Sequence, residues 1–322
     1  DYFIHYRIYA NEWSVRTNHV DVDHAMINGA PTFLTVKGWE ENPHQIVFHP
    51  YENWETISSP LEVLGNEWTR VAENYDLLVD SPAEIGNHEV LSFDIENVKH
   101  EVALVGVSNF DRMTFLKDLK AIVAVETNLF RTYHPCKKYL FILHHTENVY
   151  GGLEHLNCSL NMVPRWNYLP RDKYMQTMSL LSHEYFHLWN VKRIRPVELG
   201  PFDYQNENYT RQLWAIEGVT SFYDDYFLYL SGVSTIAEYL KTVSDNINTV
   251  ENTPGDAYQT LAESSFDAWI KYYRRNENTH NNQVSYYVKG ATVVTALNLL
   301  ILKATNAEQS MDDVMRALNR RY

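Results

Sequence analysis

The 322-residue sequence has little of what several protein classes require. Its two cysteines, Cys136 and Cys158, are too few for a disulfide framework, and whether they pair with each other is left open. It has only 12 glycines and no glycine-rich loop of the kind that cradles phosphate groups. The longest apolar run, Val293–Leu302, is interrupted by Thr295 and Asn298 and falls short of the ~18 residues that a bilayer span needs. A disulfide scaffold, a phosphate loop and a membrane span are therefore not expected.

Basic residues are scarce relative to acidic ones. The chain has 27 Lys and Arg against 41 Asp and Glu, a formal net charge of −14 at pH 7. Because a surface that binds phosphate groups needs clustered Lys and Arg, this balance argues against nucleic acid or an anionic membrane as the partner. It mildly favours a cationic ligand, such as a protonated amine.

The length suggests about two domains, and the composition, 45% apolar and 21% charged, is typical of a globular chain. Residues 1–108 hold short alternating stretches, such as Thr32–Val36 and Glu101–Val105, which predict β-strands. A helix is expected to begin near Asp111, a buried strand is expected at Tyr139–Leu143, and later helices are expected at about 173–190, 210–231, 234–250, 285–304 and 310–320. Strands first and helices later predict an α+β chain, with a β-rich domain at 1–108 and a mostly helical domain at 109–322.

The helix expected at 173–190 contains His183-Glu184-Tyr185-Phe186-His187, an H-E-x-x-H pattern. Residues four apart lie about 40° apart around a helix and one turn along it, so both imidazoles can reach one ion. Glu184 can then approach a metal-bound water and accept its proton during attack. The alternative is a buried helix with two hydrogen-bonded core histidines.

The third ligand must come from a later segment. Glu217 lies among Trp214, Ile216 and Val219 in the helix expected at 210–231, where an unpaired carboxylate is costly. Two His and one Glu leave a fourth zinc position for water, as in catalytic sites. The alternative is a Glu stabilised by the dipole at the start of its helix. Residues that follow on the same helix and could orient a ligand imidazole are Thr220, Ser221, Asp224 and Asp225.

These residues resemble a known family. The stretch 182–196, Ser-His-Glu-Tyr-Phe-His-Leu-Trp-Asn-Val-Lys-Arg-Ile-Arg-Pro, is similar to the signature of the glycyl aminopeptidase family, metallopeptidase family sixty-one. That family consists of gluzincins related to aminopeptidase N, with a thermolysin-like catalytic domain. The likeness covers essentially the whole chain and is strongest from Gly151 to Gly290. Further segments that carry it are Asn208–Thr210, Glu217–Asp225, Ser265–Tyr273 and Val284–Gly290.

The resemblance implies a fold and a metal centre. The fold is an N-terminal β domain followed by a thermolysin-like, mostly helical zinc-peptidase domain. The centre is one Zn²⁺ per chain held by His183, His187 and Glu217, with Glu184 as general base. Members usually carry more N-terminal β sequence, a further helical part and a C-terminal PDZ domain, so we expect this chain to be truncated at both ends.

The resemblance also implies how the substrate is held. Gly151-Gly152-Leu153-Glu154-His155 occupies the place of the exopeptidase motif, in which the Glu binds the free α-amino group of the substrate. Gly151 and Gly152 would line the substrate beside it. The segment departs from the better-known G-x-M-E-N form at Leu153 and His155, and an ordinary Glu after a Gly-Gly turn is the alternative.

Tyr287 matches the tyrosine of the family's Tyr-x-Lys-Gly segment, whose phenol would donate to the oxyanion of the tetrahedral intermediate. Tyr286 is adjacent, and a core aromatic is the alternative for either residue. Two other patterns are set aside. His144-His145 follows a predicted strand and its rings should face opposite sides, which favours structural roles. The stretch Lys271–Arg275 mixes basic and aromatic residues but lies in an acidic chain, where a helix surface or a contact to a substrate carboxylate is the simpler interpretation.

We therefore predict a zinc aminopeptidase that removes N-terminal residues, Gly or Ala by resemblance, from peptides with a free N-terminus. The alternatives are a thermolysin-type zinc endopeptidase and a non-catalytic, zinc-containing binding scaffold. No nucleic-acid or membrane partner is expected, and the oligomeric state stays open. A bacterial cytoplasm is the expected compartment. The periplasm or secretion stays open, because the chain begins at Asp1 in a stretch, residues 1–9, that alternates like a strand already inside a sheet.

Overall fold

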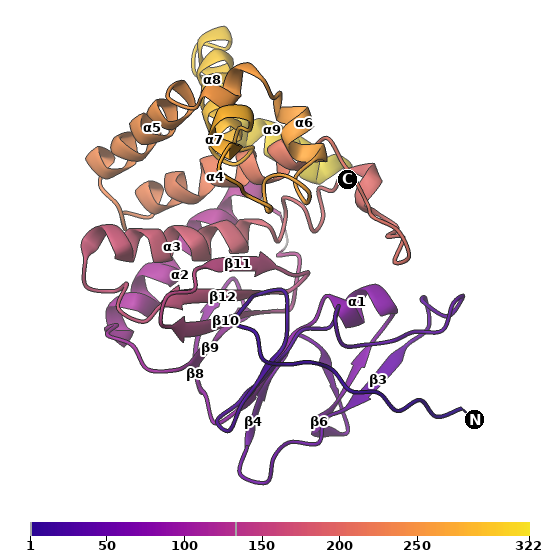
Figure 1. The fold of residues 1–322 in the computed structure, drawn as a ribbon. Helices are drawn as coiled ribbons and strands as arrows, with labels where there is room; N and C mark the ends of the chain where they lie inside the picture. The colour runs from indigo at the N-terminus through magenta and orange to yellow at the C-terminus, as the bar shows by residue number, and fades with distance from the viewer. Residues whose placement is uncertain (1, 133) are drawn as a thin grey trace. The chain divides into compact units, whose positions relative to one another are not determined.

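The structure, a computed structural model, describes residues 2–132 and 134–322 (Figure 1). Its contacts divide the chain into two compact units, which are described here one at a time. Unit 1 comprises Asp1–Leu116 and His134–Glu184, and unit 2 comprises Lys117–Tyr133 and Tyr185–Tyr322. A β-sheet region comes first and a helical region follows, so the α+β prediction is confirmed. The domain boundary at residue 108 stays a prediction.

Unit 1 begins with two small antiparallel sheets. The first has the order β1-β2-β7-β4 and consists of β1 (His19–Val20), β2 (Ala25–Ile27), β7 (Ala83–Gly86) and β4 (Thr56–Ser58). The second has the order β3-β6-β5 and consists of β3 (His44–Val47), β6 (Asn66–Ala72) and β5 (Glu62–Leu64). The short helix α1 (Tyr75–Val79) follows β6, and the side chain of Asn74 accepts a hydrogen bond from the Leu77 amide to cap it.

The five-stranded sheet is the core of unit 1. Its order is β11-β12-β10-β9-β8, from β11 (Gly151–Glu154), β12 (Cys158–Pro164), β10 (Lys138–Thr146), β9 (Val98–Val105) and β8 (Glu89–Ile95). The three central strands are parallel, and the edge strands β8 and β11 are antiparallel to their neighbours. Eight of the nine residues of β10 are buried, as expected of a central parallel strand. Glu154 therefore lies on an edge strand.

Helix α3 (Arg171–Phe186) lies against this sheet on the side of β11 (Figure 1). Its apolar residues Met178 and Leu181 are fully buried. The hydroxyl of Tyr150 donates to the carbonyl of Gln176 at 3.0 Å, and the hydroxyl of Tyr139 donates to the carbonyl of Glu184 at 3.2 Å. These contacts fix the C-terminal half of the helix over the strand that carries Glu154.

Unit 2 is helical. Helix α2 (Arg112–Phe130) runs into it from unit 1, and the other helices are α4 (Leu213–Leu230), α5 (Ile236–Glu251), α6 (Leu261–Phe266), α7 (Thr279–Asn282), α8 (Val288–Ala304) and α9 (Met311–Arg321). Three of these helices begin with a capping box. In each box the side chain of the first residue accepts a backbone N–H of the first turn, and the acidic side chain three positions later accepts the N–H of that first residue. The first residues are Thr235, Thr260 and Ser310. Asp111 accepts a hydrogen bond from the Thr114 amide, which confirms the predicted start of α2.

Helices α4 and α8 approach each other closely because two glycines meet. A Cβ atom built on Gly218 would lie 2.5 Å from the Cα atom of Gly290, and one built on Gly290 would lie 2.8 Å from the Cα atom of Gly218. Any side chain at either position would push the helices apart. The contact sets the distance between Glu217 on α4 and the start of α8 at Tyr287.

Some local predictions were wrong. Residues 2–10 and 32–36 contain no strand, and most of them are at least partly exposed. Alternation alone does not make a strand where no neighbouring strand takes up its hydrogen bonds. The strand at Glu101–Val105 is confirmed within β9, and that at Tyr139–Leu143 within β10. Cys136 and Cys158 are both buried, and both are thiols. Among the described residues, no helix combines the length and apolarity required to cross a bilayer.

Candidate active site

The H-E-x-x-H pattern lies at the C-terminal end of α3. His183 and Glu184 belong to its last turn, and His187 follows in the turn after Phe186. The helix carries His183 one turn before His187 on the same face, as predicted from the spacing. Glu184 is 5% exposed and His187 is 1% exposed, whereas His183 is half-buried. The sequence pattern thus forms the expected local geometry.

His187 has its ring fixed at both nitrogens. Its Nδ1 atom lies 2.7 Å from the carbonyl oxygen of Asn190. A carbonyl can only accept, so Nδ1 carries a hydrogen and Nε2 is the ring nitrogen directed toward helix α4. That Nε2 atom lies 3.3 Å from Oε2 of Glu217, whose side chain is 13% exposed. An imidazole nitrogen and a carboxylate oxygen at this distance can form an ion pair or act as two ligands of one metal ion.

Asn190 couples the turn after α3 to helix α4. Its side-chain amide donates to the carbonyl of Ile216 at 2.8 Å and lies 3.0 Å from Oγ1 of Thr220. This bond holds the turn that supplies the carbonyl for His187 next to the turn that supplies Glu217. Thr220 therefore acts on the imidazole through Asn190. The sequence interpretation missed Asn190, because no spacing rule links an Asn three residues beyond the motif to a later helix.

Tyr287 lies at the start of α8, in a group of three tyrosines. Its hydroxyl is 2.9 Å from that of Tyr273, which also accepts a hydrogen bond from Tyr286 at 3.1 Å. Burial and then the charge of Glu217 raise the pKa of Tyr287 well above its usual value of about 10. Tyr286 is 1% exposed and Tyr287 is half-buried. Of the two neighbours, Tyr287 is therefore the accessible hydrogen-bond donor near Glu217.

Unit 1 brings two further predicted residues together. Carboxylate oxygens of Glu154 and Glu184 lie within 4.8 Å of each other. Gly152 permits this arrangement, because a Cβ atom there would lie 2.1 Å from Oε1 of Glu184. Two carboxylates this close, at the edge of a sheet, attract a cationic group. Gly151, the other predicted substrate-lining residue, begins the same strand.

His155, one of the departures from the better-known motif, has a structural partner. Its Nδ1 atom lies 2.9 Å from Oδ1 of Asp80, and the backbone amide of Leu156 donates to Oδ2 of the same carboxylate at 2.8 Å. Asp80 follows helix α1 directly. The pair anchors the end of β11, so His155 supports the strand that carries Glu154.

The residues present fit a zinc ion. His183, His187 and Glu217 form one of the groups of candidate metal ligands among the described residues. Zinc bonds to His nitrogen and carboxylate oxygen are about 2.0–2.2 Å long, so a tetrahedral ion keeps two such ligand atoms roughly 3.3 Å apart. The His187–Glu217 separation of 3.3 Å agrees with that value. The donor set of two imidazoles and one carboxylate is that of a catalytic zinc centre.

Comparisons with known proteins give the family. A model of the M61 glycyl aminopeptidase matches residues 176–293, and a model of the peptidase M61 N-terminal domain matches residues 1–87, so that together they match more than half of the chain. The chain is also similar to the crystal structure of an aminopeptidase N family protein from Idiomarina loihiensis. The two share 34% sequence identity with a TM-score of 0.92, over 97% of this chain and 55% of that chain.

This chain thus spans about half the length of that solved relative. No curated protein matches the chain. The resemblance noted from the sequence is confirmed by both family models, whose matches include the H-E-x-x-H segment and the β-rich region at the start. The chain belongs to the M61 glycyl aminopeptidase family, a family of peptidases.

Proposed function

We propose that the chain is a zinc-dependent aminopeptidase that removes N-terminal residues, Gly or Ala by preference, from peptides. The observation that carries the proposal is the paired orientation of His187 and Glu217: Nδ1 of His187 faces the Asn190 carbonyl, and Nε2 faces the Glu217 carboxylate at 3.3 Å. With His183 one helical turn earlier, the three side chains would hold one zinc ion and leave a fourth position for water. The ion would supply a Lewis acid and lower the pKa of water to about 7.

Glu184 is the proposed general base. It follows the first ligand His directly, and it is buried beside Gly152, where its carboxylate has little freedom to move. It would take a proton from the attacking water and deliver that proton to the departing amine nitrogen. The bond between Tyr139 and the Glu184 carbonyl holds the backbone of this residue in place during both transfers.

Tyr287 and Glu154 are the proposed substrate contacts. Because burial and Glu217 raise the pKa of Tyr287, its hydroxyl stays protonated and can donate to the oxyanion that develops from the scissile carbonyl. Glu154 would bind the α-ammonium group of the substrate. The neighbouring Glu184 carboxylate adds negative potential there, and the edge position of β11 leaves its backbone available to an extended peptide.

Hydrolysis of Gly- and Ala-anilides, each compared with its N-acetylated form, tests the proposal. The free amine form should be the better substrate, because only it carries the ammonium group that Glu154 binds. Preference for the blocked form would favour the thermolysin-type endopeptidase. Bound metal without any hydrolysis would favour the binding scaffold.

A further inference from the structure

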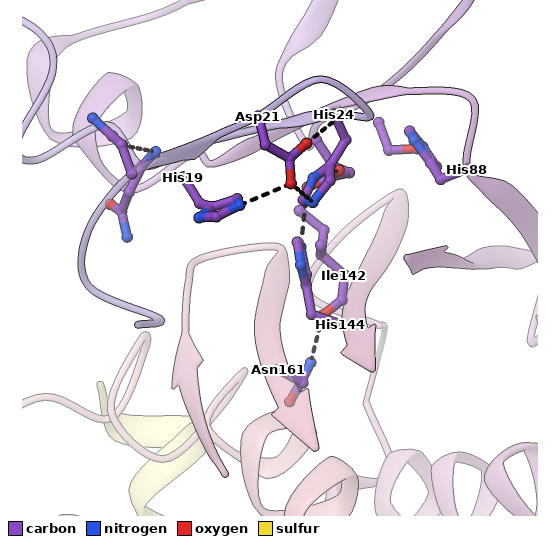
Figure 2. Close-up of polar contacts among 11 residues, drawn as sticks. His19, Asp21, His24, His88, Ile142, His144 and Asn161 are labelled. Atoms are coloured by element: carbon purple, nitrogen blue, oxygen red, sulfur yellow. Dashed lines mark hydrogen bonds and ion pairs between the residues drawn. The ribbon is translucent and has the colours of Figure 1, made fainter. Parts of the chain in front are cut away.

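A second group of histidines and a carboxylate lies within unit 1. Candidate ligand atoms of His24, Glu84 and His144 all lie within 4.8 Å of one another. Figure 2 shows His24 and His144 of this group. His24 directly precedes β2, Glu84 is in β7 and His144 is in β10. We call these three residues the sheet cluster. The proposed peptidase function uses none of them.

The register of the strands explains how the sheet cluster forms. Met26 of β2 pairs with His19 of β1 on one side and with Glu84 of β7 on the other, so these three side chains share one face of the first sheet. His24 lies two residues before Met26 and so points toward the same face. His144 reaches this face from the five-stranded sheet. The next residue, His145, points away and bonds the hydroxyl of Tyr168 at 2.8 Å, which confirms that the two rings face opposite sides.

The sheet cluster is closed to solvent. Glu84 and His144 are 0% exposed and His24 is 8% exposed. Oε1 of Glu84 lies 2.8 Å from Nδ1 of His24, and Oε2 lies 3.0 Å from Nε2 of His144. The second contact is short, yet neither Oε2 nor Nε2 has a well-aligned hydrogen-bond partner among the described residues. A carboxylate oxygen and an imidazole nitrogen held 3.0 Å apart can act as two ligands of one ion.

The charge of Glu84 requires compensation. Its side chain is 0% exposed, and its two carboxylate oxygens face imidazole nitrogens at 2.8 and 3.0 Å. A carboxylate anion buried in this way is very costly without a cation beside it. Either a protonated histidine or a metal ion can fill that role.

A second carboxylate, that of Asp21, lies near His24. Nε2 of His24 lies 3.9 Å from Oδ2 of Asp21, and His19 lies 3.1 Å from the same oxygen. The other oxygen of Asp21 accepts the backbone amides of Asp23 and His24 at 2.8 and 3.0 Å, so the carboxylate is held in a tight turn. A carboxylate often lies near the second nitrogen of a metal-bound histidine, although the 3.9 Å separation here is longer than a hydrogen bond.

The Trp13 side chain packs over the histidine rings of the sheet cluster and also lines a pocket. The indole of Trp13 stacks on the ring of His19 with centroids 4.0 Å apart and lies 5.8 Å from the rings of both His24 and His144. A pocket of about 560 Å³ is lined by Trp13, Asp21 and His24 among other residues of unit 1. An ion at the sheet cluster would therefore be reached from this pocket through His24.

We propose that His24, Glu84 and His144 bind a divalent transition-metal ion of the zinc class, through Nδ1 of His24, the Glu84 carboxylate and Nε2 of His144. Two imidazoles and one carboxylate suit zinc, cobalt and nickel better than the oxygen-preferring calcium and magnesium. Each imidazole nitrogen lies 2.8 or 3.0 Å from an oxygen of Glu84, close to the roughly 3.3 Å that separates two ligand atoms around a tetrahedral ion.

Metal counting tests this proposal independently of the peptidase centre. The chelator-treated chain is dialysed against Zn²⁺, and the bound metal is measured by mass spectrometry. Wild type should hold two equivalents, His144→Gln one, the double variant His183→Gln/His187→Gln one, and the triple variant none. Equal metal content in wild type and His144→Gln would overturn the proposal and leave a histidine–carboxylate network. If zinc content falls in His144→Gln but not in the double variant, the metal site at the sheet cluster is supported and the proposed peptidase metal is refuted.

Two controls keep the result interpretable. His145→Gln changes the adjacent buried imidazole on the same strand and should keep both equivalents, with His144→Gln matching it in circular dichroism and melting temperature. If changes within the sheet cluster prevent folding, the double variant His183→Gln/His187→Gln can be titrated with Co²⁺ instead. One equivalent should bind and quench fluorescence from Trp13, and the additional change Trp13→Phe should remove that quenching. No binding of Co²⁺ by the folded double variant would overturn the proposal.

Discussion

Two of the histidine–carboxylate groups among the described residues differ in the exposure of their carboxylates. In the helix centre, defined as His183, His187 and Glu217, the carboxylate side chain is 13% exposed. In the sheet cluster the carboxylate of Glu84 is fully buried. Both offer two imidazoles and one carboxylate. The same donor set is therefore presented in two environments, one partly open and one closed by sheets and by Trp13.

Exposure determines what each centre can do. Hydrolysis of a peptide needs a metal position that substrate and water can reach, together with a base and an oxyanion donor. Unit 2 places Tyr287 near Glu217, and the motif places Glu184 next to His183. The sheet cluster is closed to solvent, with Glu84 and His144 both 0% exposed. We therefore propose hydrolysis at the helix centre and ion binding at the sheet cluster.

The sharpest way to break this assignment is to change Glu184→Gln. The amide cannot accept the proton of the attacking water, so kcat on a Gly-anilide should fall by about 10²–10⁴. Zinc content should stay unchanged, because Glu184 is not a ligand. The matched change at the sheet cluster, His144→Gln, should leave kcat near the wild-type value. Full activity of Glu184→Gln would refute the mechanism.

Tyr287→Phe removes the proposed oxyanion donor and should lower kcat by about 10²–10³ with little change in KM. Tyr286→Phe, which removes the neighbouring buried hydroxyl, should have a smaller effect. Since the pKa of Tyr287 is raised, the donor form persists to higher pH than for an ordinary tyrosine. The kcat–pH profile should therefore show no loss attributable to Tyr287 up to about pH 10. Equal effects of the two substitutions would contradict its assignment.

Glu154→Gln should affect recognition more than chemistry. A hydrogen bond to a charged group contributes about 1.5–3 kcal/mol, so the preference for free over N-acetylated anilide should fall by about 10–100-fold. The ratio of kcat/KM for the two substrates measures this directly. An unchanged ratio would remove Glu154 from the ammonium site and favour the endopeptidase.

Asn190→Ala should weaken the helix centre and leave the sheet cluster intact. Loss of the bonds to Ile216 and Thr220 frees the turn whose carbonyl orients His187, and such outer contacts typically contribute about 10–100-fold in metal affinity. A competition titration with a chromophoric chelator should show one weakened zinc equivalent and one unchanged. Weakening of both equivalents would indicate general destabilisation instead.

Gly218→Ala tests the packing that sets the helix centre. The added Cβ atom would meet Gly290 at 2.5 Å, and overpacking of this kind costs about 1–3 kcal/mol of folding free energy. Urea unfolding should show the loss, and kcat should fall as α8 moves Tyr287. Ser221→Ala on the same helix serves as the control and should change stability by less. No difference between the two variants would show that the close approach is not required.

The sequence predicted the parts of the site that depend on local spacing. His183, Glu184 and His187 follow from a four-residue period, and Glu217 from an acidic residue set among apolar neighbours. The roles of Glu154 and Tyr287 came from family resemblance alone, because Gly152 and the Gly218–Gly290 contact act through tertiary packing. Those six roles remain predictions.

The sheet cluster could not have been predicted in this way. Its residues are far apart in the chain, since His24 directly precedes β2, Glu84 is in β7 and His144 is in β10. The pairing of Met26 in β2 with Glu84 in β7 places His24 and Glu84 on one face of the first sheet. Strand alternation correctly predicted that the rings of His144 and His145 face opposite sides. It could not predict that His144 meets Glu84, because that contact joins two different sheets. The fold class was predictable because the helix and strand periods are properties of the local sequence. The strand predictions were wrong at residues 2–9 and 32–36, because a strand also needs a neighbouring strand to accept and donate its hydrogen bonds.

The most direct test of the helix centre measures peptide hydrolysis while zinc is returned to the chelator-treated His144→Gln variant. We predict that the metal-free chain is inactive toward Gly-anilide. Activity should rise in proportion to bound zinc and reach its maximum at one equivalent, and it should not return in His183→Gln/His187→Gln. Full hydrolysis by the metal-free chain, or restored activity in that double variant, would contradict the account.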